Sequence, residues 1–182
     1  MFFAAIENAD DSLKVERLYY QYRKLMYKEA YAILKDNHFA EDAVDESFIR
    51  IINNLHKIDE SNIPRTRNFL VIICRNVAKD MYKSRIYLNS GDDLSDDITN
   101  EEAGVFSDPS DVVIDKDSAK LLISAIENLD PIYRDVFLLK RVHGLSREEI
   151  SVIFGISVET VKKRLLRAKI KIVSSLEKEG IK

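Results

Sequence analysis

Basic side chains are concentrated near the carboxyl end of this 182-residue chain. Between residues 157 and 171 there are six basic side chains and a single acid, Glu159. Ammonium and guanidinium groups on one helix face attract phosphate oxygens, and polar side chains at a helix start can reach base edges. The chemistry that these residue types offer is binding of nucleic acid.

The same segment has two faces when it is drawn as a helix at 100° per residue. Apolar side chains fall on one side and predict a packing face, formed by Val158, Val161, Leu165, Ala168 and Ile172. Polar and basic side chains fall elsewhere, and those expected to bind DNA are Ser157, Glu159, Thr160, Lys162, Lys163, Arg164, Arg167 and Lys171. Those near the helix start would read bases, and those further along would contact phosphates. A basic face alone is more often an ordinary solvated surface.

Local signals place this helix in a helix-turn-helix over residues 146–168. Ser146 and Glu149 have the spacing of a capping box, which predicts the start of a short first helix. Gly155 suits a turn that needs positive φ, and Ser157 then caps the second helix. Upstream, Asp130 and Pro131 form a strong helix start. Together these signals favour DNA binding over a solvated helix.

The rest of the chain predicts an all-α fold in two small helical domains. Apolar spacing indicates helices over about 12–35, 39–55 and 67–85, with a loop at 57–66. We expect domains at 1–85 and 118–182, joined by a flexible acidic linker at 86–117. Residues 85–120 hold 3 basic and 10 acidic side chains, whereas 121–182 hold 12 basic and 8 acidic. The overall net charge of −3 hides this division.

Other features narrow the class of protein. The single cysteine, Cys74, lies in an apolar run and is expected to be an inert core thiol. The three histidines, His38, His56 and His143, are expected at the surface rather than as metal ligands. No phosphate loop or catalytic cluster is evident, so we expect no catalytic, metal or cofactor site. No apolar run is long enough to cross a membrane, and we expect a cytoplasmic protein without membrane insertion.

Three runs of sequence resemble a known family. Residues 145–168, LSREEISVIFGISVETVKKRLLRA, are similar to region 4 of sigma factors of the extracytoplasmic-function (ECF) group within the sigma-70 family. Residues 40–50, AEDAVDESFIR, and 68–80, NFLVIICRNVAKD, are similar to two runs of region 2. Asp45 and Phe69 depart from the residues usual in that family, which are Gln and Trp. The resemblance covers most of the chain.

The resemblance implies a non-enzymatic subunit that binds core RNA polymerase and directs transcription initiation at specific promoters. The clamp helices of the largest polymerase subunit would be contacted by Asp42, Asp45, Glu46, Phe48 and Arg50. DNA at the −10 element would be contacted by Arg65, Arg67, Arg75, Asn76, Lys79 and Lys83, and region 4 would read the −35 element. Members of the group are often held by an anti-sigma factor, and the sequence does not decide whether this chain has such a partner.

One alternative is a helix-turn-helix regulator that binds its DNA alone and never joins polymerase. The 40–50 and 68–80 runs argue against this class, because a regulator has no need of them. An enzyme acting on nucleic acid and an anti-sigma factor are further alternatives. The first lacks a recognisable catalytic cluster, and the second would lack the basic recognition helix.

Overall fold

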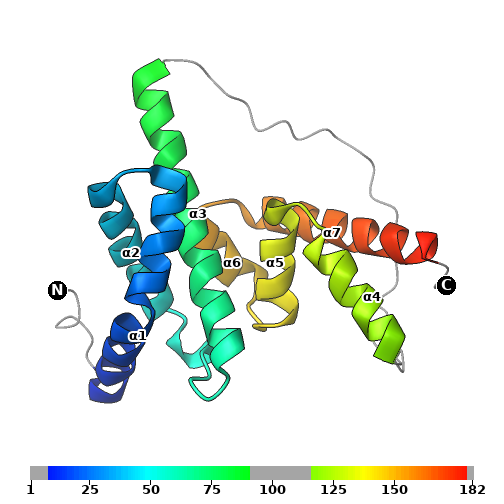
Figure 1. The fold of residues 1–182 in the computed structure, drawn as a ribbon, viewed down its shortest axis with the longest axis horizontal. Coiled ribbons are helices and arrows are strands. Elements are labelled where there is room, and N and C mark those ends of the chain that lie inside the picture. Colours follow the sequence, from blue (N-terminus) through cyan, green and yellow to red (C-terminus); the bar gives the residue numbers. More distant parts are fainter. Residues whose placement is uncertain (1–7, 91–115, 180–182) are drawn as a thin grey trace.

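The computed structural model describes residues 8–90 and 116–179, and every regular element in these ranges is helical (Figure 1). The elements in chain order are α1 (Ala9–Leu34), α2 (Asn37–Ile52), the 3-10 helix η2 (Leu55–Lys57), α3 (Ile63–Ser90), α4 (Lys116–Glu127), α5 (Pro131–Arg141), α6 (Arg147–Phe154) and α7 (Val158–Lys178). The prediction of an all-α fold is confirmed. The predicted linker falls mainly on residues 91–115, which lie outside the described residues.

Helices α1, α2 and α3 form one group, which we call the N-terminal bundle. The turn between α1 and α2 is defined by Lys35, which adopts a left-handed conformation with φ of 54°, and by Asp36, whose side chain caps α2 by accepting from two main-chain amides. Helix α3 begins at Ile63, four residues before the predicted start. Pro64 is compatible with this first turn, because the amide it lacks would have no helical partner there.

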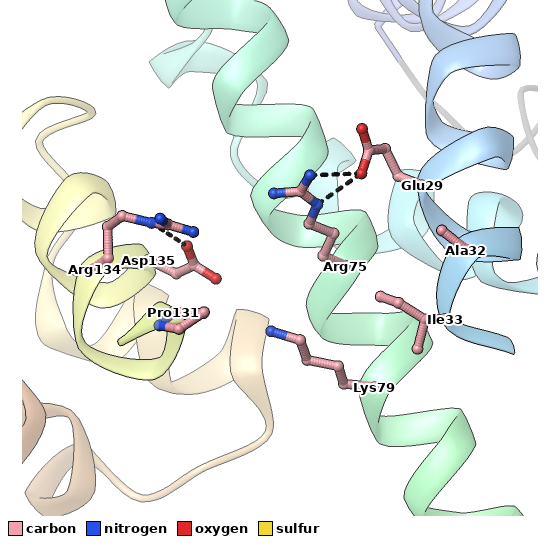
Figure 2. Close-up of a pocket in the computed structure, with 8 residues that line it drawn as sticks. All are labelled: Glu29, Ala32, Ile33, Arg75, Lys79, Pro131, Arg134 and Asp135. Atoms are coloured by element: carbon pink, nitrogen blue, oxygen red, sulfur yellow. Dashed lines mark hydrogen bonds and ion pairs between the residues drawn. The ribbon is translucent and has the colours of Figure 1, made fainter. Parts of the chain in front are cut away.

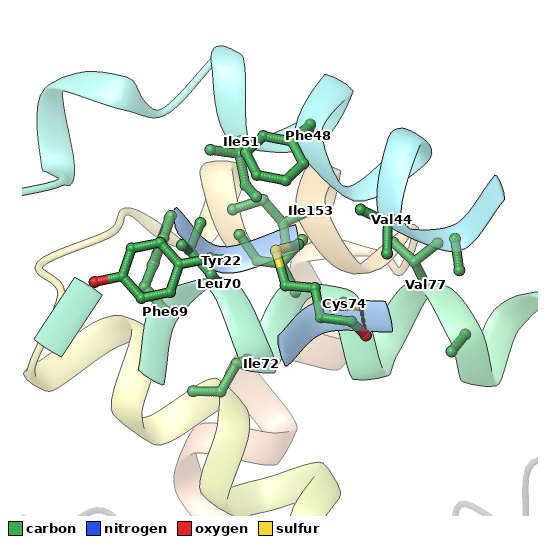
Figure 3. Packing of buried hydrophobic residues seen from close by; sticks show 14 of the residues in the cluster. Tyr22, Val44, Phe48, Ile51, Phe69, Leu70, Ile72, Cys74, Val77 and Ile153 are labelled. Atoms are coloured by element: carbon green, nitrogen blue, oxygen red, sulfur yellow. Dashed lines mark hydrogen bonds between the residues drawn. The ribbon is translucent and has the colours of Figure 1, made fainter. Parts of the chain in front are cut away.

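The N-terminal bundle buries an apolar core between its three helices (Figure 3). Met26 from α1, Phe48 from α2 and Ile73 from α3 are each fully buried. Cys74 is buried beside them, and its thiol donates to the carbonyl oxygen of Met26 at 3.3 Å. Burial raises the pKa of this thiol to about 11, which keeps it protonated and confirms the prediction of an inert core cysteine.

Helices α4 to α7 form a second group, which we call the C-terminal bundle. Helix α7 is long enough to pack against both ends of this group. Its first half contributes Val161 to the core near α6, and its second half contributes Ala168 and Ile172 to a small cluster with Ala125 and Leu129. Val158 was predicted on the packing face, but it is 39% exposed, since it lies in the first turn beyond the edge of the core.

The two bundles share one apolar core instead of having fully separate ones. Figure 1 shows α6 beside the middle of α3, with α5 next to α6. In Figure 3, Ile153 of α6 lies among the side chains of α2 and α3. Val136 and Leu139 of α5 belong to the same buried cluster as Ile72 of α3. Burial of this apolar surface stabilises the contact between the bundles.

Candidate nucleic-acid interface

Helices α6 and α7 form the helix-turn-helix that the sequence predicted. The Ser146 hydroxyl accepts from the Glu149 amide at 3.0 Å, and the Glu149 carboxylate accepts from the Ser146 amide, so the capping box is complete. Gly155 ends α6 in the left-handed region with φ of 60°. The Ser157 hydroxyl accepts from the Thr160 amide at 3.1 Å and fixes the start of α7. The relative orientation of the two helices therefore depends on three local features: the capping box, the left-handed glycine and the cap of α7.

The first turns of α7 present polar side chains to solvent. Ser157, Glu159, Lys162 and Lys163 are exposed, and Lys162 lies 3.9 Å from the carboxylate of Glu159. Such an exposed N-terminal half is the part of a recognition helix that enters the major groove. The predicted base-reading end of α7 is thus accessible.

The later basic residues of α7 differ in accessibility, and Lys171 is exposed. Arg164 and Arg167 are half-buried. The Lys171 ammonium lies 3.1 Å from the Asp130 carboxylate and 5.5 Å from the centre of the Tyr133 ring. Asp130 takes this ion pair and makes no side-chain hydrogen bond as N-cap of α5, although Pro131 follows it as predicted. Lys171 is therefore engaged within the C-terminal bundle.

The residues predicted to bind −10 DNA lie along α3, on two differently exposed parts of it. Arg67 and Lys83 are exposed, whereas Arg65, Arg75, Asn76 and Lys79 are half-buried. These four half-buried side chains lie on the side of α3 that meets the C-terminal bundle. Arg75 also pairs with Glu29 of α1, with Nη2 and Oε2 2.7 Å apart.

A cavity of about 310 Å³ lies where α3 and α1 meet the start of α5 (Figure 2). Arg75 and Lys79 border it on one side, and Arg134 and Asp135 border it on the other. Asp135 is only 5% exposed. Burial raises the pKa of its carboxyl group, while the charges of Lys79, Arg134 and Arg75 act in the opposite direction. An acid of α5 thus sits among the polar side chains of α3.

Helix α2 carries the residues predicted to contact polymerase. Asp42 and Asp45 are exposed, and Asp45 accepts from the Tyr19 hydroxyl at 3.3 Å. Phe48 is fully buried in the core, so its inclusion among the surface contacts was wrong: it lies on the apolar face of the helix. Ile49 is 49% exposed and was missed. Its spacing of seven and four residues from the two acids could have identified it as part of their face.

Arg50 of α2 makes contacts in both bundles. Its guanidinium lies 3.0 Å from the Glu46 carboxylate and 3.5 Å from that of Asp80 on α3. Its Nη1 donates to the carbonyl oxygen of Ile153 in α6 at 2.6 Å. The pKa of Asp80 is raised by burial, against the effects of Arg50, Lys83 and Arg164. Arg50 is therefore mainly a structural link in this arrangement.

His143 lies in the contact between the bundles, and its predicted place at the surface was wrong. It is 2% exposed, and its ring centre is 5.1 Å from that of Phe69 on α3. Burial, together with nearby Arg65, lowers the pKa of His143 to about 4. His38 and His56 are exposed as predicted.

The described residues contain no group of three or more side chains suited to a metal ion. Among the same residues, no helix combines the length and apolar character needed to span a membrane.

Comparisons with known proteins give two family matches in the expected order. Residues 18–86 match the model described as Sigma-70 region 2, and residues 119–172 match Sigma-70, region 4. The first match covers the N-terminal bundle from within α1 to α3. The second covers the C-terminal bundle from within α4 to within α7.

Individual relatives carry the same description. The chain is 26% identical to the ECF RNA polymerase sigma factor SigE of Mycolicibacterium smegmatis, covering 85% of this chain and 58% of that protein. It is 29% identical to SigW of Bacillus subtilis, covering 81% of each chain. It is 27% identical to SigM of the same organism, covering 86% of this chain and 91% of SigM.

Among solved structures, the co-crystal structure of the sigma factor RpoE with the anti-sigma factor NepR from Bartonella quintana aligns at 17% identity and a TM-score of 0.37. That alignment covers 89% of this chain and 96% of the other. Both family regions are present in the order that the sequence predicted, and the relatives named above are ECF sigma factors. The chain belongs to the sigma-70 family, in its ECF group, whose members are the non-catalytic proteins with which RNA polymerase begins transcription at specific promoters.

Proposed function

We propose that this chain directs promoter-specific transcription initiation by joining core RNA polymerase and presenting two separate DNA-binding surfaces. The observation that carries the proposal is the combination of a region 2 bundle with a complete, doubly capped helix-turn-helix of region 4 in one chain. A regulator that acts alone would need only the second of these.

The −35 element is assigned to the N-terminal half of α7. In this assignment Glu159 accepts from the exocyclic amine of cytosine, and Lys163 donates to guanine or to a phosphate. Their exposure supports this assignment. Lys171 is given a lesser role than its charge suggests, because it is paired with Asp130.

The −10 element is assigned to α3. Arg67 and Lys83 are exposed and are the first of its basic side chains that DNA would meet. Arg75, Asn76 and Lys79 follow along the helix, and they would contact DNA once their present neighbours on α5 have moved away. Basic side chains along one helix track a phosphate backbone, and this supports the assignment.

Polymerase docking is assigned to the exposed face of α2 that holds Asp42, Asp45 and Ile49. An apolar side chain flanked by acids is a surface that a basic and apolar partner face would fit. The partner proposed is the pair of clamp helices of the largest polymerase subunit. Arg50 borders this face and links it to α6.

We also propose a cytoplasmic location, where polymerase and promoter DNA are found, and an anti-sigma factor as a further partner, since the family resemblance implies that such proteins often hold ECF sigma factors. Co-purification of the tagged chain from its source cells, followed by mass spectrometry, would test the second point. Recovery of polymerase subunits alone would argue against a stable anti-sigma complex.

The function is tested by adding the purified chain to bacterial core polymerase and sequencing run-off transcripts from fragmented source DNA. Discrete starts that depend on the chain and share two upstream elements are the expected result. Absence of such starts, with DNA binding by the chain alone, would establish the regulator class and overturn the proposal.

A further inference from the structure

Residues 58–62 form a loop between η2 and α3, which we call the entry loop of α3. Ile58 at its start is 6% exposed, whereas residues 59–62 are all exposed. The Asp59 carbonyl oxygen accepts from the Asn62 amide at 3.0 Å and from the hydroxyl of Thr66 at 2.7 Å. Thr66 is 2% exposed, so this bond is made from inside the bundle. The entry loop is therefore exposed along most of its length but closed by its own main chain.

Two polar side chains of the entry loop order it further. The Asp59 carboxylate accepts from the Ser61 hydroxyl at 2.6 Å and from the Ser61 amide at 3.0 Å, and these hydrogen bonds lower the pKa of Asp59. The Asn62 side-chain oxygen accepts from the Arg65 amide at 3.2 Å, which is the bond of a helix N-cap. The side-chain nitrogen of Asn62 makes no hydrogen bond with any residue that the structure describes. It is therefore available to a partner.

Helix α1 holds the entry loop from outside at two points. The Lys14 ammonium donates to the Ile58 carbonyl oxygen at 2.7 Å and to that of Leu55 at 2.9 Å. Arg17 donates from two nitrogens to the two carboxylate oxygens of Glu60, at 3.0 Å and 2.8 Å. A bidentate pair of this kind fixes direction as well as distance. Lys14 thus holds the start of the loop, and Arg17 holds its middle.

Stability of the fold does not account for the pair of Arg17 and Glu60. Their side chains are 58% and 34% exposed, and ion pairs at such sites add little to the free energy of unfolding. The geometry of the pair instead restricts which shapes an exposed loop can adopt. We therefore treat Lys14 and Arg17 as a clamp on the entry loop.

The entry loop borders the DNA surface assigned to α3. It leads directly into the first turns of this helix, where Arg67 is exposed and Ile63 is 57% exposed. Arg67 follows Asn62 by five residues, which is about 7.5 Å of helix rise. A strand that contacts Arg67 therefore lies within reach of Asn62, whose amide can bond a base edge.

We propose that Lys14 and Arg17 are positioning residues for recognition of the −10 element: they hold the entry loop in one shape, and that shape presents Asn62 to the opened strand near Arg67. This inference rests on the proposed function, because it concerns the DNA surface assigned there. A contact that is ordered before binding costs less conformational entropy than one ordered by the ligand. A loop free to adopt several shapes would accept different bases more equally, so the clamp contributes to base preference.

The clamp is tested first in the full chain alone, by hydrogen exchange with mass spectrometry. Arg17→Glu places two carboxylates together and should speed exchange of the amides of the entry loop and Thr66. The reversed pair, Arg17→Glu with Glu60→Arg, should restore slow exchange. The matched control is Lys28→Glu, which makes the same charge change at an exposed site three turns further along α1 and should leave exchange unaltered. Unchanged exchange in Arg17→Glu, or fast exchange in the reversed pair, would overturn the clamp.

A second variant tests the other point of the clamp without introducing repulsion. Lys14→Met keeps a long side chain but removes the donor, and it should speed exchange of the same amides. Lys14→Arg keeps a cation at this position and should preserve slow exchange. Faster exchange throughout α1, α2 and α3 in Lys14→Met would show a general loss of stability, and it would contradict a role confined to the loop.

Positioning is tested by transcription with core polymerase from two libraries of one promoter identified by the run-off experiment, randomised at the −10 or at the −35 element. Arg17→Glu and Lys14→Met should reduce base preference at a −10 position by about fivefold, equivalent to about 1 kcal/mol, and leave −35 preferences unaltered. The reversed pair should restore the preference. A purely structural defect would lower transcription from all sequences alike, so reduced transcription with intact −10 preference would overturn positioning.

The role of Asn62 and the proposed function have their own outcomes. Asn62→Ala should reduce preference at the same −10 position as the clamp variants, and loss at another position or at none would exclude Asn62 as the group that is positioned. If the unmodified chain supports no transcription with polymerase, the proposed function fails, and the assignment to −10 recognition falls with it. Hydrogen exchange would still report whether Lys14 and Arg17 clamp the loop, so the two failures are separable.

Discussion

The guanidinium of Arg50 donates from Nη1 to the carbonyl oxygen of Ile153 at 2.6 Å, across 103 positions of sequence. Arg50 also contacts Glu46 and Asp80, at 3.0 Å and 3.5 Å. One half-buried side chain thus connects α2, α3 and α6. Arginine suits this role because its planar group donates in several directions at once.

Replacement of Arg50 by methionine should lower the free energy of unfolding by about 1–3 kcal/mol, because it leaves a main-chain oxygen and a half-buried carboxylate without their donor. The matched control is Arg23→Met. Arg23 lies at the surface, 3.7 Å from Glu41 and 5.6 Å from the centre of the Tyr19 ring, and its loss should have little effect. Urea denaturation followed by circular dichroism measures both. Equal stabilities of the two variants would contradict a linking role for Arg50.

Gly155→Val should lower the free energy of unfolding by about 1–3 kcal/mol. Gly155 has φ of 60°, a region that β-branched residues resist, and a Cβ at this position would meet no atom within 4 Å. The cost is therefore conformational. Gly155→Asn, which tolerates the left-handed region, should cost much less. A valine variant with the melting temperature of the unmodified protein would show that the turn can adopt another shape.

Lys163→Ala should weaken binding of the polymerase complex to promoters by about 1–3 kcal/mol if a base contact is lost. A base contact would make the loss depend on the −35 sequence, and a phosphate contact would make it uniform. Gel-shift titration against a library of −35 variants distinguishes these results. The control is Lys178→Ala, at the far end of α7. No loss with any −35 variant would remove Lys163 from the DNA surface.

Asp42→Lys combined with Ile49→Ala should weaken binding to core polymerase by about tenfold, equivalent to about 1.4 kcal/mol. Both side chains are exposed, so the fold should be unaffected. Glu16→Lys, an exposed acid on α1, makes a similar charge change away from this face and should bind normally. Surface plasmon resonance with immobilised core polymerase provides the measurement. Unchanged affinity would place the polymerase contact elsewhere.

His143 should make stability fall as the pH drops from about 6.5 to about 4. The pKa of His143 is lowered from its ordinary 6.5 to about 4 in the folded chain. The unfolded chain therefore binds more protons in this window, so the stabilisation present above pH 6.5 is lost toward pH 4, by about 3 kcal/mol in all.

Removing the histidine tests that assignment. His143→Gln should have a flatter stability profile than the unmodified chain between pH 6.5 and 4, whereas His56→Gln, an exposed site, should not. The raised pKa values of Asp80 and Asp135 act in the opposite direction but are common to all three proteins. Parallel profiles for His143→Gln and the unmodified chain would show that His143 is not held neutral.

The features that the sequence predicted correctly are local ones. The capping box of Ser146 and Glu149, the left-handed Gly155 and the cap at Ser157 each depend on residues within a few positions of one another. Their preferences act before any tertiary contact forms, so one sequence is sufficient to identify them. The order of the two family regions was also evident from short runs.

The features that were missed depend on contacts between distant segments. His143 resembles a surface residue in sequence because it follows α5 at a helix end, yet it is buried by α3. Ile49 resembles a core residue, yet its side of α2 has no neighbour within the described structure that covers it. Four of the residues predicted to bind −10 DNA are half-buried, because they also lie where α3 meets the C-terminal bundle. Helical spacing defines faces but does not say which face meets which.

Under the proposed function, the face of α3 that holds Ile72, Asn76 and Lys79 has to fit two unlike surfaces. One is the apolar and acidic side of α5, and the other would be the sugar-phosphate backbone of an opened promoter. A substitution that improves the fit to one of them will often impair the fit to the other. Sequence change on this face would therefore be limited twice, because each substitution alters the fit to α5 and the fit to DNA together.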